Sequence, residues 1–239
     1  MATFLLFLLF GKNVKKKSLI NPRWTNNHFM LLRSNDISDL SRIFRLNLIN
    51  SISGIKPVNL IGTASKKGRE NLAIFSSVVH LGSNPAQLGF VMRPQGEHLS
   101  DTFQNINDTG FYTINHVTES LVKKAHYTSA KLPDETSEFE RMQIEKTFID
   151  GFAAPFVKQS PFKIGMKHLE NISLPNGCFL VIGEVVLLEV EDSSIDDKGQ
   201  LDLSTHNGVG VSGLNRYYQL QLMEEWPYVR ESEIPNFDE

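Results

Sequence analysis

The chain has 239 residues, of which 41% are hydrophobic and 21% are charged. This composition is typical of globular proteins and excludes a disordered or collagen-like chain, and the length suits one large domain or two small ones. Lys and Arg number 24 against 27 Asp and Glu, a net charge of −3, which argues against nucleic-acid binding because that requires a basic surface. The single cysteine, Cys178, has no partner for an internal disulfide. An oxidising compartment is therefore not required, and we expect a cytoplasmic protein.

Residues 1–29 differ from the rest of the chain. Residues 1–10 are apolar and five basic residues follow them. The rest of the chain therefore holds 19 basic and 27 acidic residues, a net charge of −8. A secretory signal carries its charges before the apolar run and a membrane span needs roughly 20 apolar residues, so the segment has the pattern of neither. A short membrane-surface anchor is one interpretation; a simple extension, with Met30 as the true start, is the other. We assign 1–29 to an extension outside the fold and 30–239 to one domain, and expect no membrane association.

Residues 36–53 have the pattern of an amphipathic helix, because apolar residues recur every three or four positions. Asp36 is placed to cap its start, and Gly54 to end it. Ile43 and Leu46 widen the apolar face, which would suit contact with a second subunit.

The next segments alternate short apolar runs with turn residues, which predicts strands over 58–65, 71–82 and 86–93. They lie too close together for crossover helices, so the sheet should be antiparallel. A helix capped by Ser100 and ended by Gly110, a strand over 111–117, a helix over 118–130 and a short helix at 137–143 follow. Strands are predicted over 161–171 and 178–192, with a bulge or close approach at Gly183. About seven strands with inserted helices predict a mainly β, antiparallel barrel with flanking helices.

General motifs add little. Gly208, Gly210 and Gly213 match G-x-G-x-x-G, but they do not lie between a strand and a helix of a βαβ unit, so a mobile loop is the better interpretation. The seven histidines are scattered without metal-ligand spacing, and we expect no metal site. No acid–base pair follows from spacing alone.

The segment VNLIGTASKKGRENLAIFSS (58–77) resembles the opening hairpin of the flavin reductase-like, FMN-binding split-barrel family. That family has Asn-x-Ala-Pro-x-Ser where this chain has Asn71-Leu72-Ala73-Ile74-Phe75-Ser76. Further segments resemble the family in the same order over about 30–230: 85–93, 100–106, 110–117, 129–130, 137–139 and 181–185. The resemblance implies a six-stranded antiparallel Greek-key split barrel, and a homodimer that binds FMN at the subunit interface.

The resemblance also implies a phosphate site. Arg93 would supply the cation, and Ser100, Asp101 and Thr102 would offer amides and hydroxyls at the start of a helix. The family often has Lys at the position of Ser100, and His98 is a possible substitute. Asp101 would repel a phosphate that it faced, so we expect it to cap backbone amides. An ordinary capped helix is the alternative interpretation.

The remaining candidates would contact the ribityl chain and the ring. Ser76 and Ser77 are candidates for ribityl or phosphate oxygens, and Thr63, Asn71 and Ala73 for the flavin edge. Cross-strand pairing alone is the alternative explanation for these three. After the second helix, His126, Ser129 and Ala130 occupy positions where the family approaches the ring. His126 would tune the flavin or contact substrate, or be purely structural; Asn115 is a lesser candidate.

One departure concerns the electron donor. NAD(P)H-dependent members carry Gly-Asp-His before the late barrel strand, and that histidine borders the nicotinamide site. Here Asn176-Gly177-Cys178 stands in its place, so the resemblance supports FMN better than NAD(P)H. Cys178 begins an apolar strand, which favours a buried structural role over a redox thiol.

Three hypotheses follow. The first is an FMN-dependent oxidoreductase that takes electrons from NAD(P)H or a partner redox protein. The second is a non-catalytic FMN-binding module for storage, sensing or assembly. The third is the same barrel holding a different ligand, such as pyridoxal phosphate or haem. The sequence identifies neither the substrate nor catalytic residues.

Overall fold

The structure, a computed structural model, describes residues 29–133 and 135–237, so the expected extension lies outside the described residues except for Phe29. The chain divides into two compact units, residues 1–48 and 49–239, which we describe separately. The described part of the first unit contains α1 (Ser34–Asp39) and most of α2 (Arg42–Ser51).

The prediction of one helix over 36–53 was wrong, because the helix is broken at Leu40. Leu40 has an extended ψ of 147°, and the Ser41 hydroxyl then accepts a hydrogen bond from the Phe44 N–H (3.4 Å), which starts α2. Asp36 is not the N-cap: it lies in the first turn of α1, and its carboxylate accepts the N–H of Arg33, the residue that holds the cap position (2.9 Å).

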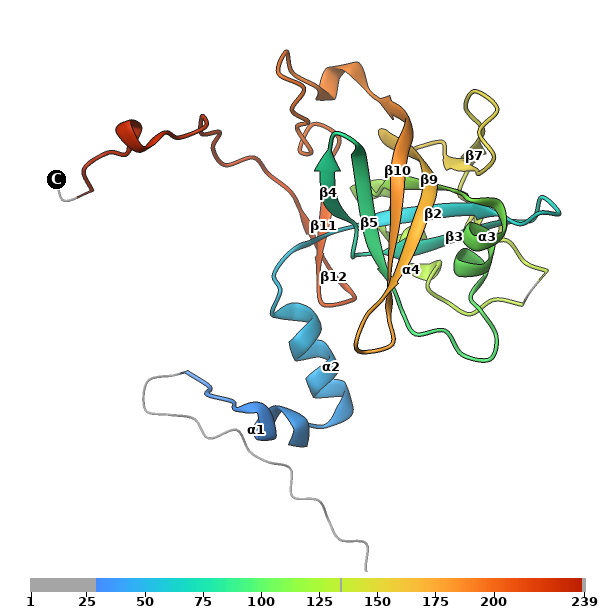
Figure 1. The fold of residues 1–239 in the computed structure, drawn as a ribbon, viewed down its shortest axis with the longest axis horizontal. Coiled ribbons are helices and arrows are strands. Elements are labelled where there is room, and N and C mark those ends of the chain that lie inside the picture. The colour runs from blue at the N-terminus through green and yellow to red at the C-terminus, as the bar shows by residue number, and fades with distance from the viewer. Residues whose placement is uncertain (1–28, 134, 238–239) are drawn as a thin grey trace, which may run out of the picture. The chain divides into compact units, whose positions relative to one another are not determined.

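The second unit is built around a seven-stranded antiparallel sheet of order β3-β2-β6-β9-β10-β5-β4 (Figure 1). Its strands are β2 (Asn59–Ala64), β3 (Glu70–Phe75), β4 (Val79–Ser83), β5 (Ala86–Met92), β6 (Phe111–His116), β9 (Phe162–Ser173) and β10 (Phe179–Val190). Strand β10 occupies most of the predicted 178–192 run, and its pairing with β9 slips at Gly183. The bulge expected there is confirmed, and a Cβ at Gly183 would overlap the Tyr112 hydroxyl.

The predicted strand 71–82 is in fact two strands at opposite edges of this sheet. Between β3 and β4, the Ser77 hydroxyl accepts the Val91 N–H (3.0 Å) and donates to the Val91 carbonyl (3.2 Å). Phe75 also packs edge-on against Phe90, with ring centroids 5.0 Å apart. The chain thus brings the two sheet edges together. This division raises the strand count from six to seven, while the mainly β, antiparallel split-barrel class is confirmed.

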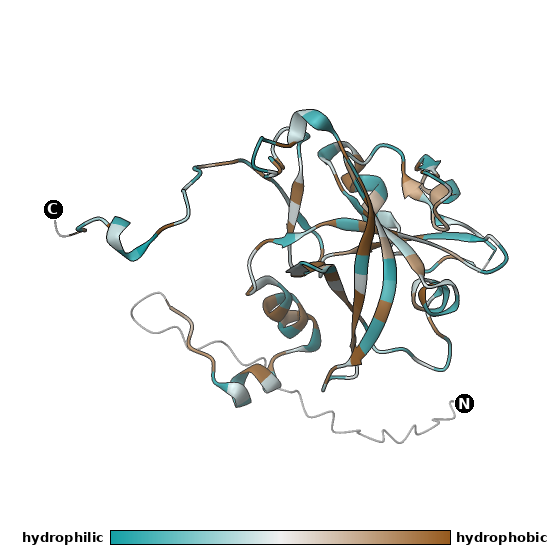
Figure 2. Ribbon diagram, turned by 45° about the horizontal axis from the view of Figure 1, so that its top comes forward, coloured by the Kyte–Doolittle hydropathy of each residue, from teal (hydrophilic) through white to brown (hydrophobic). Residues whose placement is uncertain are grey.

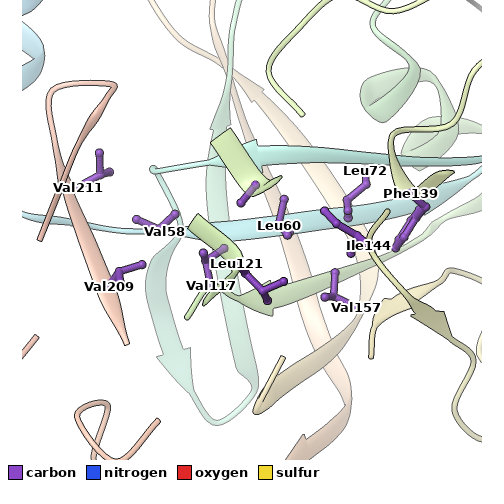
Figure 3. Close-up of a cluster of buried hydrophobic side chains, with 11 residues drawn as sticks. Val58, Leu60, Leu72, Val117, Leu121, Phe139, Ile144, Val157, Val209 and Val211 are labelled. Atoms are coloured by element: carbon purple, nitrogen blue, oxygen red, sulfur yellow. The ribbon is translucent and has the colours of Figure 1, made fainter. Parts of the chain in front are cut away.

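Two hydrophobic clusters lie on opposite faces of β2, because neighbouring residues of a strand point to opposite sides. Ile61 belongs to the cluster inside the barrel, which Phe103 and Ile106 of α3 (Asp101–Thr109) complete. Leu60 belongs to the other cluster, beneath α4 (Val122–Tyr127) and α5 (Glu138–Arg141) (Figure 3). Figure 2 shows the matching bands of hydrophobic and hydrophilic residues along the strands.

The smaller elements depart most from the predictions. The helix expected over 118–130 is a 3-10 turn, η1 (Glu119–Leu121), followed by the shorter α4. Residues 208–213 are not a loop, because β11 (Val209–Ser212) pairs with β1 (Lys56–Pro57) and β12 (Arg216–Gln219). Gly210 is required there, since a Cβ would overlap the Ile55 side chain. The remaining elements are β7 (Lys146–Thr147), β8 (Phe156–Val157), η2 (Asp192–Ser194) and η3 (Glu231–Glu233).

Candidate functional site

Three predicted phosphate or ribityl ligands gather at the end of β5. Ser77 is bonded to Val91, Arg93 directly follows the strand, and the Ser100 hydroxyl lies 3.9 Å from the sulfur of Met92. Arg93 is exposed, and its guanidinium forms no hydrogen bond or ion pair with any described residue. An exposed cation without a partner among the described residues suits an anionic group.

Ser100 holds the N-cap position of α3, as expected, but its side chain does not cap the helix. Its backbone N–H and its hydroxyl both donate to the Gln95 side-chain oxygen (2.9 and 3.0 Å). Gln95, to which no sequence pattern pointed, ties the segment between β5 and α3 together. Because the Ser100 side chain leaves the first turn of α3 uncapped, its amides keep the partial positive charge of a helix N-terminus.

The expectation that Asp101 caps backbone amides was wrong. Its carboxylate instead accepts a hydrogen bond from the Arg69 guanidinium at 2.7 Å, an ion pair in which both side chains are partly exposed. Arg69 lies in the hairpin turn between β2 and β3, thirty-two residues away. The pair compensates the negative charge at the start of α3, which would otherwise oppose an anion there.

Thr63, Asn71 and Thr102 form a cluster inside the fold rather than lining an open surface. The Asn71 amide donates to the hydroxyls of Thr63 (3.3 Å) and Thr102 (2.9 Å), and the Asn105 amide also donates to Thr63 (3.1 Å). All four side chains are buried. Buried polar groups destabilise the fold unless they are hydrogen-bonded. The cluster provides these hydrogen bonds for the polar side chains of β2, β3 and α3.

The free edge of β3 is partly covered by Glu138 of α5, whose carboxylate accepts the Leu72 N–H (3.1 Å). Burial raises the pKa of Glu138, opposed by its hydrogen bonds to backbone N–H groups. In an antiparallel ladder, the backbone N–H and C=O groups of successive residues point alternately toward and away from the neighbouring strand. Because the Leu72 N–H points away from β2, the N–H and C=O of Ile74 do so as well, whereas those of Ala73 face Ile61 of β2. Ala73 is half-buried, as is Ser76 beyond the strand end. The backbone group open to a ligand therefore belongs to Ile74.

The last turn of α4 and the residues just after it hold His126, Ser129 and Ala130. This segment is distant in sequence from the end of β5. His126 shares a 2.9 Å hydrogen bond with the Tyr217 hydroxyl, a contact to β12 that the sequence reasoning missed. The Ser129 hydroxyl donates to the His126 carbonyl (2.7 Å), and the Ala130 N–H donates to the Tyr127 carbonyl (3.1 Å). Ser129 and Ala130 are exposed, so these three residues form a helix end with one anchored histidine.

The two lesser candidates, Asn115 and His98, differ in burial. Asn115 is buried and fully engaged: its amide donates to Leu60 and Thr113, and its oxygen accepts the Val157 N–H (2.9 Å). It joins β6 to β2 and β8 and is structural. His98 is exposed, five residues beyond Arg93 on the same connection to α3.

The turn between β9 and β10 holds Asn176, Gly177 and Cys178. The Asn176 side chain accepts the Cys178 N–H (3.0 Å), and Leu174 and Cys178 close the turn through a backbone hydrogen bond (2.8 Å). Cys178 is half-buried. Phe179, the first residue of β10, pairs with Met92 of β5, which places this turn at the same end of the barrel as Arg93.

A cavity of about 810 Å³ lies elsewhere, at the opposite ends of β9 and β10. Its polar wall includes the ion pair of Lys163 and Glu189 (2.5 Å). The predicted FMN-binding residues do not line it. At about 3.3 Å per residue, β10 separates it from the Arg93 end by roughly 35 Å, so it is a separate feature of the barrel.

No helix in the described ranges is long and apolar enough to cross a membrane. Within the same ranges, no group of three or more His, Cys, Asp or Glu side chains is arranged to hold a metal ion.

Comparison with known proteins gives the family. Residues 54–206, more than half of the chain, match the family described as "Flavin reductase like domain". The chain therefore belongs to the flavin reductase-like family, and the resemblance read from residues 58–77 is confirmed.

Three solved structures show how far the likeness extends. A split-barrel protein from Shewanella frigidimarina NCIMB 400, named for a proposed flavin-reductase function, is 42% identical; the match covers 84% of this chain and 100% of that chain, with a TM-score of 0.80. Nitrilotriacetate monooxygenase component B from Bacillus cereus is 20% identical over 83% and 98% of the two chains, with a TM-score of 0.73. An FMN-binding protein from Thermus thermophilus is 15% identical over 72% and 90%, with a TM-score of 0.61. The last two show the fold alone.

Proposed function

We propose that the end of β5 binds the phosphate of FMN. The observation that carries this proposal is the exposed Arg93 guanidinium, which has no partner among the described residues. Arg93 directly follows Met92, whose sulfur lies 3.9 Å from the Ser100 hydroxyl at the uncapped start of α3. Phosphate favours a guanidinium together with helix N-terminal amides, and the Ser100 hydroxyl would join them by turning away from Gln95. The Arg69–Asp101 ion pair removes the charge that would oppose it.

The rest of the cofactor would extend along the edge of β3, past Ser76 and the outward-facing backbone of Ile74, toward the end of α4. Thr63, Asn71 and Thr102 support this surface from inside without touching the ligand, since their hydrogen bonds are already made. The family resemblance adds a homodimer with FMN at the subunit interface, so a single chain would supply only one wall of the site. This accounts for the absence of the predicted residues from the 810 Å³ cavity.

The activity that fits best is an FMN-dependent oxidoreductase. Bound FMN supplies one- and two-electron transfer, and the protein holds and orients it. The Shewanella protein is named for flavin reduction, and the Thermus protein for FMN binding. The donor would be NAD(P)H or a partner redox protein.

The test begins with FMN titration into purified protein, followed by NADH or NADPH without oxygen. Loss of the absorbance of oxidised flavin at enzymatic rates supports the oxidoreductase. A protein that takes up no added FMN contradicts the binding site itself and would indicate a different ligand on the same barrel.

One observation favours a second function, a non-catalytic FMN-binding module. Asn176, Gly177 and Cys178 form the turn near Arg93 where NAD(P)H-dependent members carry Gly-Asp-His, so the histidine that borders the nicotinamide is missing. This alternative would be supported if the protein binds FMN but NADH and NADPH do not reduce it, and if no small-molecule or protein reductant reduces it at an enzymatic rate.

We also propose that residues 30–239 act as one FMN-binding domain in the cytoplasm and that residues 1–29 lie outside it. Deletion of residues 1–29 should leave a folded protein with unchanged FMN affinity. Precipitation of the shortened chain, or loss of FMN, would assign the segment to the fold.

A further inference from the structure

The C-terminal arm, residues 220–237, is apolar and largely uncovered. It follows β12, and its first residue, Leu220, still donates its N–H to the Gly208 carbonyl (2.9 Å). Beyond this point Met223 is 92% exposed, Trp226 75%, Tyr228 91% and Phe237 82%. The arm is drawn in red in Figure 1. Scattered exposed apolar residues are common, but large aromatic side chains concentrated in one segment mark an interaction surface.

The arm is also acidic. It carries four glutamates, at 224, 225, 231 and 233, against the single Arg230. Glu225 pairs with Lys198 (3.3 Å), which holds the first part of the arm against the turn before β11. Pro227 and Pro235 have no backbone N–H to donate. The arm is therefore poorly suited to join a sheet as an added strand and would bind through its side chains.

Two apolar surfaces of the described chain could receive such an arm. One is α2, which buries none of its residues: Ile43 is 62% exposed and Ile49 47%. The other is the outer side of the barrel, where Val79 of β4 and Ile172 of β9 are exposed. Charge separates them, because α2 contains Arg42 and Arg45 and no acidic residue, whereas β9 and β10 hold three glutamates and two lysines, Glu170, Glu184, Glu189, Lys163 and Lys167. An acidic arm is attracted by the first surface and gains no such attraction from the second.

We propose that the C-terminal arm of one copy docks on α2 of a second copy, so that two arms are exchanged in a dimer. An amphipathic helix needs a surface to cover its apolar side, and the arm brings the aromatic anchors that dominate interfaces. Each buried aromatic side chain removes about 150–250 Å² from water. Two arms, with two or three aromatic residues each, then approach the roughly 1,200–2,000 Å² of a specific interface.

This inference concerns residues outside the matched segment 54–206 and does not depend on bound flavin. The chain has two tryptophans, so Trp24→Phe leaves Trp226 as the single reporter in an otherwise full-length protein. Dimerisation is measured by analytical ultracentrifugation and Trp226 emission over the same concentrations, with and without FMN. We expect the emission to shift to shorter wavelength in step with dimer formation.

Three variants locate the contact. In the full chain, Trp226→Glu and Arg42→Glu should each weaken the dimer at least about tenfold, and adding Glu224→Arg to Arg42→Glu should restore part of the loss. Val79→Glu, on the competing surface, should have no effect, and circular dichroism confirms that each variant is folded.

Three results would overturn the proposal. In the first, the Trp226 emission in the dimer stays that of a solvent-exposed indole. In the second, the emission is already shifted in the monomer, which would mean that the arm folds back on its own chain. In the third, Val79→Glu weakens the dimer and Arg42→Glu does not. Each of these is independent of whether the protein turns yellow with FMN.

Discussion

Two groups of polar residues lie close together in this barrel and differ in what they leave free. In the interior cluster, Thr63, Asn71 and Thr102 bond to one another and to Asn105. At the end of β5, the Arg93 guanidinium is exposed and bonds to no described residue. Burial makes the difference, since a polar group inside the fold must find a partner within it, while one at the surface can await a ligand. The first group should therefore govern stability and the second should govern binding.

The largest expected effect on stability comes from His116, which faces the interior edge-on to Phe162 at 5.1 Å. Burial lowers the pKa of His116 from 6.5 to about 4. The folded state thus binds this proton less tightly than the unfolded chain does, and stability falls as the pH drops from about 6.5 toward 4. His116→Phe keeps the ring packing without the proton, so the acid-induced loss should shrink by about 2–3 kcal/mol. Urea unfolding at several pH values measures it, and equal pH dependence in both proteins would refute it.

Asn71→Ala tests the interior cluster directly. It removes two hydrogen bonds and leaves the Thr102 hydroxyl buried without its donor, which should lower the free energy of unfolding by about 1–3 kcal/mol. FMN affinity of the folded protein should stay unchanged. If FMN affinity falls tenfold while stability is kept, Asn71 is a ligand contact and the comparison fails.

Ser76 and Ser77 form a matched pair within one connection. The Ser77 hydroxyl is bonded to Val91 on both sides, whereas the Ser76 hydroxyl has no hydrogen-bond partner among the described residues. Ser77→Ala should cost about 1 kcal/mol of unfolding free energy, and Ser76→Ala about 0.5–1.5 kcal/mol of FMN affinity. Denaturation and FMN titration of both variants check this, and a reversed assignment of the two losses would contradict it.

The smallest effect concerns Glu138, whose raised pKa means that the folded state binds its proton more tightly than the unfolded chain. The stabilisation by this proton is present at low pH and is lost as the pH rises through the folded-state pKa. Glu138→Gln keeps an acceptor for the Leu72 N–H but cannot ionise. The variant should therefore gain stability relative to the native protein as the pH rises from about 4 to 7, and a constant difference would show that Glu138 titrates normally.

The sequence predicted the strands with the strongest apolar pattern and the family, but not what depends on distant partners. The run at 178–192 and the end of a helix at Gly110 follow from local propensity, and both were confirmed. Residues 71–82 show one continuous pattern, and only the bonds from Ser77 to Val91 reveal that the chain passes between two sheet edges there.

The candidate site shows the same limit. Asp101 and Arg69 are thirty-two residues apart, so their ion pair could not be predicted from the helix start alone. Residue type placed Asn71 and Arg93 in one list of ligands, while burial, which no local pattern reports, separated them. Asn105 and Glu138 were missed as members of the site, although both lie within segments that resemble the family.

The most direct test of the account is FMN titration of Arg93→Ala beside Arg216→Ala, which removes an exposed arginine of β12 as a control. Loss of a charge-assisted bond to phosphate should weaken FMN binding by about 1.5–3 kcal/mol, roughly ten- to a hundredfold, in the first variant only. The free energy of unfolding should be unchanged in both. Equal FMN affinity of Arg93→Ala and the native protein would contradict the account, because it would remove the one uncompensated cation on which the proposed phosphate site depends.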